Sequence, residues 1–353
     1  MPINLSIYDT GELNRVLYDE KTLGTPETFW LTEFFRNEIT FDDDYVDFDR
    51  VGSTRRMAPL VVPTAQGRPV VSRAEKVTRL RPAYLKPKDA VDPNRLIRKT
   101  VGIGELGGDP SQAMSPTQRM AAVAAAILQE HRHSIIRRWE WMAAQATIYG
   151  QVTLEGPDYP KTVVDFQRDP SLTVTLTGSD TWNSGTANIL ASITQLRKIM
   201  RNVPFGGKAN VMIIGTDAAN VMLDDQRVQE QLDRTLRIEQ EPSLKTGVRN
   251  ADDYEYIGNI ATGLPVYVCS ATYEDDDGTT KDFLDPKDVV LVGDIQGHRL
   301  FGAIRDVDML RPVPMWTKSW KQEDPSERFI MTQSAPLMAP INPNRSLRAR
   351  VLS

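Results

Sequence analysis

Cysteine and histidine are scarce in this chain. A single cysteine, Cys269, and three histidines occur among its 353 residues. One cysteine excludes an intrachain disulfide and any cysteine pair spaced for metal binding or redox chemistry, and it fits a reducing compartment. With so few histidines, and no serine in a GxSxG setting, the sequence provides neither a hydrolase triad nor a histidine-rich metal centre.

Long apolar runs and an excess of basic charge are also missing. The most apolar stretch, Ala121 to Leu128, is bounded by Arg119 and Glu130, and it is much shorter than the roughly 20 residues of a membrane-spanning helix. The opening residues, MPINLSIYDTG, lack a basic region followed by an apolar one, so we expect no signal peptide. The formal net charge of −5 argues against a dedicated nucleic-acid binder.

What the chain does have is charge separated into two adjacent blocks. Residues 1–49 hold twelve acidic and three basic side chains, a balance of −9, whereas residues 50–99 hold thirteen basic and three acidic, a balance of +10. Like charges in one segment repel, so each block is most stable against a surface of opposite sign, in its own chain or in a neighbouring copy. This pattern indicates assembly before it indicates catalysis.

The two charge blocks differ in their expected structure. The acidic block has helical patterns near Glu12–Tyr18 and after Thr25, where Pro26 suits a first helical position, and it offers apolar anchors but little core. Residues 55–86 are typical of a long two-stranded excursion, with strands at 57–62, 70–71 and 77–85 around a turn at 66–67. Because an isolated hairpin is marginally stable in water, a partner surface must cover it. We therefore expect intersubunit contacts from Arg55, Arg56, Arg68, Arg73, Lys76, Arg79, Arg81, Lys86, Asp42, Asp43 and Asp44.

The clearest helix signal starts at Ser115. The run Ser115-Pro116-Thr117-Gln118 combines an N-cap, a first-turn proline and a capping-box residue, and apolar residues then recur every three or four positions up to Tyr149. This pattern predicts one helix over residues 116–149, a rod about 50 Å long at roughly 1.5 Å per residue. Such a rod is a spine on which other elements can pack.

The second half of the chain alternates between strand and helix patterns. We expect helices through 189–200 and from about Asp217, a hairpin turn at Asp277-Gly278, and strands near 162–166, 172–177, 211–214, 257–268, 289–292, 300–304, 329–334 and 347–351. The last strand needs a sheet to join. Pairing with the strands at 162–177 would place an α+β unit as an insertion within a discontinuous domain.

Motifs that suggest nucleotide chemistry do not have the required context. Gly102, Gly104 and Gly107 match the spacing of a dinucleotide-binding loop, but no helix follows until Pro116, so a glycine-rich loop is the favoured interpretation. The run at 206–208, Gly-Gly-Lys, resembles a phosphate-binding loop but lacks the following hydroxyl, and we expect a turn.

Candidate metal sites are equally weak. His131 and His133 are two residues apart on the predicted helix, whereas helical metal pairs are four apart, so we interpret them as a solvated pair. The acidic runs at 42–44 and 275–277 lack the glycine or bidentate glutamate of a calcium loop. Tryptophans 139, 141, 316 and 320 are expected in the core or at subunit contacts. We predict no cofactor, no metal and no enzymatic activity.

Particular strings resemble a known family. FFRNEITFDDDYVDFDRV lies in the acidic block, RRMAPLVVP and PAYLKPKDAVDP flank the excursion, and DPSERFIMTQSAPLM precedes the C-terminus. Together with the order of the predicted elements, they resemble the lambda-type major capsid proteins of tailed bacteriophages. The resemblance implies an α+β fold of the Hong Kong ninety-seven phage capsid type. Its expected parts are an acidic N-terminal arm at 1–50, a basic extended loop at 51–90, a peripheral domain at 91–180 with the spine helix, an axial α+β domain at 181–320, and C-terminal strands at 321–353 that return to the peripheral domain.

The resemblance also implies a function. The chain would self-assemble into hexamers and pentamers of an icosahedral phage head that encloses double-stranded DNA, with each extended loop lying across a neighbouring subunit. Expected partners are copies of the chain, a separate scaffolding protein, a portal and a decoration protein; DNA contacts would be weak and non-specific, and assembly would occur in the host cytoplasm. No motif assigns a covalent cross-link between subunits. The alternatives are an encapsulin-like compartment and a nucleotide-dependent oxidoreductase built on residues 102–107.

Overall fold

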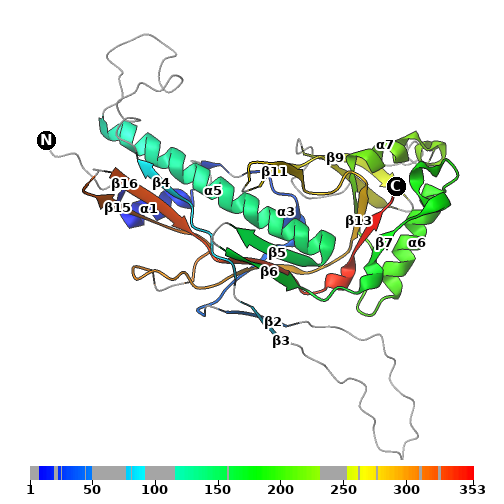
Figure 1. The fold of residues 1–353 in the computed structure, drawn as a ribbon, viewed down its shortest axis with the longest axis horizontal. Helices are drawn as coiled ribbons and strands as arrows, with labels where there is room; N and C mark the ends of the chain where they lie inside the picture. Colours follow the sequence, from blue (N-terminus) through cyan, green and yellow to red (C-terminus); the bar gives the residue numbers. More distant parts are fainter. Residues whose placement is uncertain are drawn as a thin grey trace, which may run out of the picture.

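The fold combines a long helix with several small sheets and one larger sheet (Figure 1). The computed structural model describes residues 8–19, 23–24, 26–43, 45–49, 77–80, 82–91, 116–156, 159–230, 253–260, 263–275, 277–309, 312–324 and 327–353. The helices are α1 (Thr10–Leu17), α3 (Trp30–Phe34), α5 (Pro116–Tyr149), α6 (Ile189–Asn202) and α7 (Thr216–Asp224). The strands are β1 (Asn37–Thr40), β2 (Val46–Asp49), β3 (Val77–Leu80), β4 (Lys88–Val91), β5 (Gln151–Gly156), β6 (Tyr159–Asp165), β7 (Thr173–Thr175), β8 (Val211–Gly215), β9 (Tyr254–Ile260), β10 (Leu264–Cys269), β11 (Thr272–Glu274), β12 (Thr280–Asp282), β13 (Asp288–Val292), β14 (Gly297–Phe301), β15 (Trp316–Gln322), β16 (Glu327–Gln333), β17 (Pro336–Pro340) and β18 (Ser346–Arg350).

The predicted spine helix is confirmed as α5, which begins and ends at the predicted residues and runs along the body of the molecule (Figure 1). Its C-terminus is followed by Gly150 at φ +69°, a left-handed conformation that favours glycine. Arg168 donates from Nη1 to the carbonyl oxygen of Ile148 at 2.7 Å. Because the last carbonyls of a helix lack partners within the helix, this bond stabilises the end of α5.

The largest sheet has six strands in the order β7-β18-β13-β8-β10-β9. Alternate residues of its central strands enter two different cores: Met212, Ile214 and Leu291 contact the cluster formed with α6 and α7, whereas Ile213 and Val290 belong to the cluster formed with α5. This alternation follows from the two-residue period of a strand. Both faces of the sheet are therefore buried.

The C-terminal strand lies inside this sheet. β18 pairs with β7, as the sequence predicted, and the structure shows this pairing to be parallel. It also pairs antiparallel with β13, which the sequence did not predict. The other predicted partner, the strand near residues 162–166, pairs with β5 instead. The strand β18 thus joins the chain's final residues to the centre of the α+β unit.

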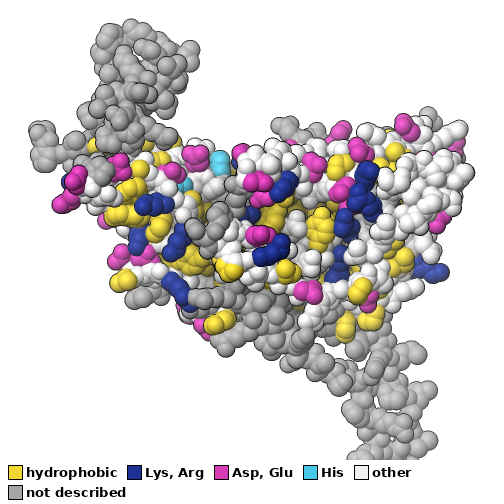
Figure 2. Space-filling model, in the orientation of Figure 1, with side chains coloured by type: hydrophobic (Ala, Val, Ile, Leu, Met, Phe, Trp, Pro, Cys, Tyr) yellow, Lys and Arg dark blue, Asp and Glu magenta, His cyan; other side chains and the backbone are white. Residues whose placement is uncertain are grey.

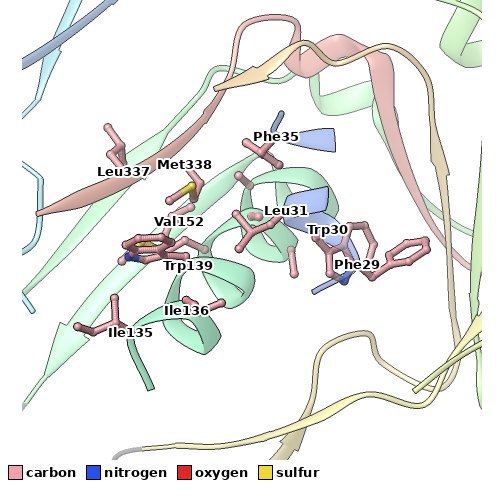
Figure 3. Packing of buried hydrophobic residues seen from close by; sticks show 14 of the residues in the cluster. Phe29, Trp30, Leu31, Phe35, Ile135, Ile136, Trp139, Val152, Leu337 and Met338 are labelled. Atoms are coloured by element: carbon pink, nitrogen blue, oxygen red, sulfur yellow. The ribbon is translucent and has the colours of Figure 1, made fainter. Parts of the chain in front are cut away.

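The N-terminal segment is part of the main core, which corrects the expectation that it contributes little core. Trp30 and Phe35 are 0% exposed and belong to the same buried cluster as Trp139 of α5 and Met338 of β17. Figure 3 shows Phe29, Trp30, Leu31 and Phe35 beside the side chains of α5. A three-stranded sheet, β1-β14-β17, extends this connection from the N-terminal segment to the C-terminal strands.

Several element boundaries differ from the sequence-based expectations. The helix expected from Pro26 begins only at Trp30, and the strand expected over 77–85 ends at Leu80. The single strand expected at 257–268 is a hairpin, β9 and β10, whose turn includes Gly263 at φ +81°. The sequence also missed β1, β2, β4, β5, β15 and β17, while the hairpin turn at residues 277–278 is confirmed between β11 and β12.

Candidate assembly site

The two charge blocks meet at an antiparallel strand pair, β2 with β3. The register places Asp47 of the acidic block directly opposite Arg79 of the basic block. The backbone pairing covers four opposed residues on each strand, from Val46 opposite Leu80 to Asp49 opposite Val77. The pair therefore joins the two blocks within one chain, and the intervening residues 50–76 connect two neighbouring strands.

The segment after β14 contacts the chain on both sides of this strand pair. The backbone N–H of Ala303 donates to the carbonyl oxygen of Asp43 at 3.2 Å, just before β2. The backbone N–H of Arg305 donates to Tyr84 Oη at 2.9 Å, just after β3. Gly302 lies so close to Pro82 that an added Cβ would be 2.8 Å from the proline ring. These contacts hold the chain before β2 and the chain after β3 against the same segment, residues 302–305.

Tyr84 continues into a polar network. Its Oη donates to Gln333 Oε1 at 2.9 Å, and Gln333 Nε2 donates to Asp306 Oδ2 at 2.9 Å. Asp306 also forms an ion pair with Lys318 of β15. Gln333 is fully buried, so its amide needs these partners. The network attaches the chain after β3, at Tyr84, to the sheet β15-β16-β4.

The structure describes only some of the predicted contact residues. Lys86 is exposed, and its Nζ lies 4.8 Å from the centroid of the Tyr84 ring. Asp42 and Asp43 are also exposed, and Arg79 is placed by its backbone in β3. The remaining predicted residues lie outside the described part of the chain: Arg55, Arg56, Arg68, Arg73, Lys76, Arg81 and Asp44.

A buried carboxylate holds the N-terminal segment against the spine helix. Glu140 Oε1 accepts hydrogen bonds from the backbone N–H groups of Phe29 and Trp30, each at 2.7 Å, and Oε2 accepts from Leu31 N–H at 2.9 Å. Burial raises the pKa of Glu140 to about 7, while the three N–H donors and the charge of Arg299 act in the opposite direction. The carboxylate thus serves as the N-terminal cap of α3 from a distant helix.

The other end of α3 is also held. Arg299 of β14 donates from Nε to the carbonyl oxygen of Phe35 at 2.6 Å and from Nη2 to that of Leu31 at 3.2 Å. Trp30 Nε1 donates to Tyr254 Oη at 2.9 Å. Sequence reasoning missed this anchoring site. The available signal was the acidic side chain of Glu140 next to Trp139 and Met142 on the apolar face of the spine helix.

His131 contradicts the prediction of a solvated histidine pair. Its side chain is 1% exposed, with Nδ1 3.1 Å from Thr332 Oγ1 and Nε2 2.9 Å from Asp89 Oδ2. Burial lowers the pKa of His131, while the hydrogen bond to Asp89 raises it. His133 is half-buried, and its Nε2 lies 3.2 Å from the carbonyl oxygen of Leu23. His131 therefore connects α5 to β4 and β16.

The other candidate motifs give no chemical site in the described residues. The run predicted as a turn, 206–208, is non-helical and directly follows a turn at 204–205, and a Cβ on Gly206 would be 2.1 Å from the carbonyl oxygen of Met200. The glycine loop at 102–107 lies outside the described part. Among the residues that the structure covers, no group of three or more metal-binding side chains occurs. None of the helices in those residues is long and apolar enough to cross a membrane.

Comparisons with known proteins give a consistent result. The family described as phage major capsid protein E matches residues 14–351. The major capsid protein of Enterobacteria phage P21 is 26% identical over 91% of this chain and 93% of its own length. The major capsid protein of Escherichia phage lambda is 24% identical over 96% of this chain and 98% of its own length.

One solved structure shares the whole fold. The crystal structure of a prophage protein of Escherichia coli CFT073, described there as a capsid protein, aligns with a TM-score of 0.72 and 24% sequence identity. The alignment covers 97% of this chain and 98% of that chain. This likeness confirms the predicted α+β fold of the Hong Kong ninety-seven type.

Proposed function

Because this chain belongs to the phage major capsid protein E family, we propose that its copies join as hexamers and pentamers into the icosahedral head of a phage that encloses double-stranded DNA. The chain is a structural major capsid protein of the virion and not an enzyme. The observation that carries the proposal is the family match over residues 14–351, which includes every described sheet.

The proposed division of labour follows the charge blocks. Residues 1–50 form an arm and 51–90 an extended loop, with 91–180 and 321–353 as the peripheral domain and 181–320 as the axial domain. The strands β2 and β3, which precede and follow residues 50–76 in the sequence, pair with each other. The basic side chains of the loop would contact the acidic surface of a neighbouring copy. Many weak polar contacts of this kind, repeated over a closed shell, allow each assembly step to be reversed and corrected.

Further partners belong to the same proposal. A separate scaffolding protein, a portal and a decoration protein would assist assembly in the host cytoplasm, and the packaged DNA would make weak, non-specific contacts. The net charge of −5 supports weak DNA contact, because strong binding to phosphates needs a positive surface. Analysis of the contents of purified shells distinguishes DNA packaging from the protein cargo of an encapsulin-like compartment.

Reversal of three loop charges tests the proposal. The variant Arg68→Glu, Arg73→Glu, Lys76→Glu should keep the circular dichroism and melting temperature of the wild type, but it should not form shells in electron microscopy or light scattering. Like charges would then face each other across the subunit contact.

A matched control separates the loop from charge in general. Lys198, Lys208 and Lys321 are lysines outside the basic block, and their joint change to glutamate alters net charge by the same amount. The control should assemble. Shells formed by the loop variant at the wild-type yield would contradict the proposed role of the loop charges.

A further inference from the structure

The strand β1 presents an open sheet edge. All four of its residues are exposed, and in the described part of the chain it lies at the end of the order β1-β14-β17. The N–H of Phe41 donates to the carbonyl oxygen of Phe301 at 2.8 Å, so odd-numbered residues direct their backbone groups toward β14. Because successive residues alternate, the N–H and C=O of Glu38 and Thr40 are directed outward. Such an edge can accept another strand.

Exposed apolar side chains gather on the segments around this edge. In the residues that the structure describes, five large hydrophobic side chains are exposed: Tyr18 at 49%, Ile39 at 38%, Tyr45 at 42%, Val163 at 51% and Val307 at 93%. Ile39 lies on β1, and the charge of Glu38 on the same strand helps to raise the pKa of Tyr18, which places that ring nearby. Tyr45 follows β1 by five residues, and Val307 lies four residues after Ala303. Tyr18 Oη donates to the carbonyl oxygen of Met315 at 2.6 Å, and Ala303 N–H donates to that of Asp43, which joins the chain before Tyr45 to the segment before Val307.

This grouping is what requires an explanation. Single exposed hydrophobic side chains are ordinary on protein surfaces, whereas several on one side of a subunit mark an interaction surface. On the face drawn in Figure 2, exposed hydrophobic side chains occur singly and in small groups among charged ones. Val307 lies in a turn and is 93% exposed, so a partner molecule that covers it would bury more apolar side-chain surface there than at the other four residues.

The same surface is acidic. Its exposed charged residues include Glu38, Asp42, Asp43 and Asp308, against the basic Arg36 and Arg305. The complementary charge is present in the chain itself, since residues 50–99 carry a balance of +10. Part of that block is already used within its own subunit, because β3 pairs with β2 and Lys86 lies over the Tyr84 ring.

We propose that this β1 surface is the docking site for a second copy of the chain, which contacts it through its basic block. The β1 surface comprises the outer edge of β1 and the exposed side chains of Tyr18, Glu38, Ile39, Asp42, Asp43, Tyr45, Val307 and Asp308. The inference rests on the proposed capsid function and names the surface that receives the neighbouring subunit. Backbone pairing and apolar burial contribute affinity, while the charges select the partner.

Lysine substitutions test the β1 surface with an internal control. The double variant Ile39→Lys, Val307→Lys places positive charge where a basic partner should dock, at two exposed side chains of which Val307 is 93% and Ile39 38% exposed. We expect a folded subunit whose unfolding free energy falls by no more than about 1 kcal/mol, and at least a tenfold lower yield of sedimenting shells. Val163→Lys alters the one exposed hydrophobic residue outside the surface, among those that the structure describes, and should assemble at the wild-type yield.

Cross-linking identifies the occupant. A photoreactive phenylalanine analogue at position 39, in shells assembled from a mixture of isotopically light and heavy subunits, should yield mixed-label cross-links to residues 50–99. Cross-links confined to one chain, or to another protein or to other residues, would overturn the inference. Wild-type shell yield from the double variant would also overturn it while leaving the proposed function intact. Failure of the wild type to form shells under any condition would instead contradict the proposed function.

Discussion

Glu140 is the side chain on which the N-terminal segment most depends. It is a buried carboxylate with three backbone N–H partners from residues 29–31, more than 100 positions away in sequence. Buried backbone donors without partners lower stability, so the three N–H groups need the carboxylate as an acceptor. The buried carboxylate in turn needs these N–H groups as donors. The spine helix and the N-terminal arm are therefore coupled through one residue.

Removal of this carboxylate should destabilise the subunit. Glu140→Ala leaves the three N–H groups without an acceptor, and we expect a loss of about 2–5 kcal/mol in the free energy of unfolding. Chemical denaturation of the unassembled subunit measures it. Glu130→Ala, an exposed glutamate on the same helix, is the control and should change stability by less than about 0.5 kcal/mol. An equal loss in both variants would contradict the capping role.

The raised pKa of Glu140 predicts a pH dependence of stability. A carboxyl group whose pKa is about 7 in the folded state, against an ordinary value of 4.5, binds its proton more tightly when folded. This tighter proton binding stabilises the folded state by on the order of 3 kcal/mol. The stabilisation is fully present below pH 4.5 and is lost as pH rises through about 7.

The variant Glu140→Gln isolates this contribution because its amide does not titrate. Denaturation between about pH 5 and pH 8 should show a smaller loss of stability with rising pH in the variant than in the wild type. Identical pH profiles for the two proteins would show that Glu140 keeps an ordinary pKa in the folded state.

The sequence could not assign these side chains. The patterns at Glu140 and His131 fix their positions on a helix, but burial depends on segments that arrive from residues 29–31, 89 and 332. A polar residue on the apolar face of a predicted helix indicates that a buried partner exists, but it does not show which segment supplies that partner. For this reason the solvated interpretation of His131 was wrong and the cap formed by Glu140 was missed.

At the scale of elements, the N-terminal arm is part of the core of the subunit. Phe29 stacks on Tyr254 with ring centroids 4.3 Å apart, and the fully buried Trp30 donates to the same tyrosine. The short helix α3 thus packs between α5 and the hairpin β9–β10. Changes in this arm should affect folding as well as assembly.

Truncation of Trp30 measures the contribution of the arm. Trp30→Ala creates a large cavity and removes the hydrogen bond to Tyr254, so we expect a loss of about 3–5 kcal/mol in denaturation experiments. Ile39→Ala, in the exposed strand β1 of the same arm, should cost less than about 1 kcal/mol. A small loss in Trp30→Ala would indicate that the arm is not needed for subunit folding.

The predictability of elements depended on the range of the interactions that define them. The spine helix was predicted to the residue because its cap, first-turn proline and periodicity are local signals. The start of α3 was predicted four residues early because Glu140, and not Pro26, sets it. The strands β5, β15 and β17 were missed because each exists through a partner strand and two of them carry few alternating apolar residues.

At the scale of the whole molecule, the acidic and basic blocks are joined by one strand pair, and the rest of their charged residues lie outside it. The acidic and basic blocks meet in the backbone at the strand pair β2 and β3, where Asp47 and Arg79 are opposed in the register. We propose that the acidic β1 surface and the basic residues beyond this pair serve the contacts between copies. The sequence predicted the blocks and a role for them in assembly, while the open edge of β1 became evident only from the sheet order.

The position of the basic block in an assembled shell tests the account most directly. In a cryo-electron-microscopy reconstruction of shells formed by this chain, residues 50–76 of one subunit should lie against the β1 surface of another, with apolar contact at Val307. A reconstruction in which these residues contact only their own subunit, with the β1 surface open to solvent, would contradict the account.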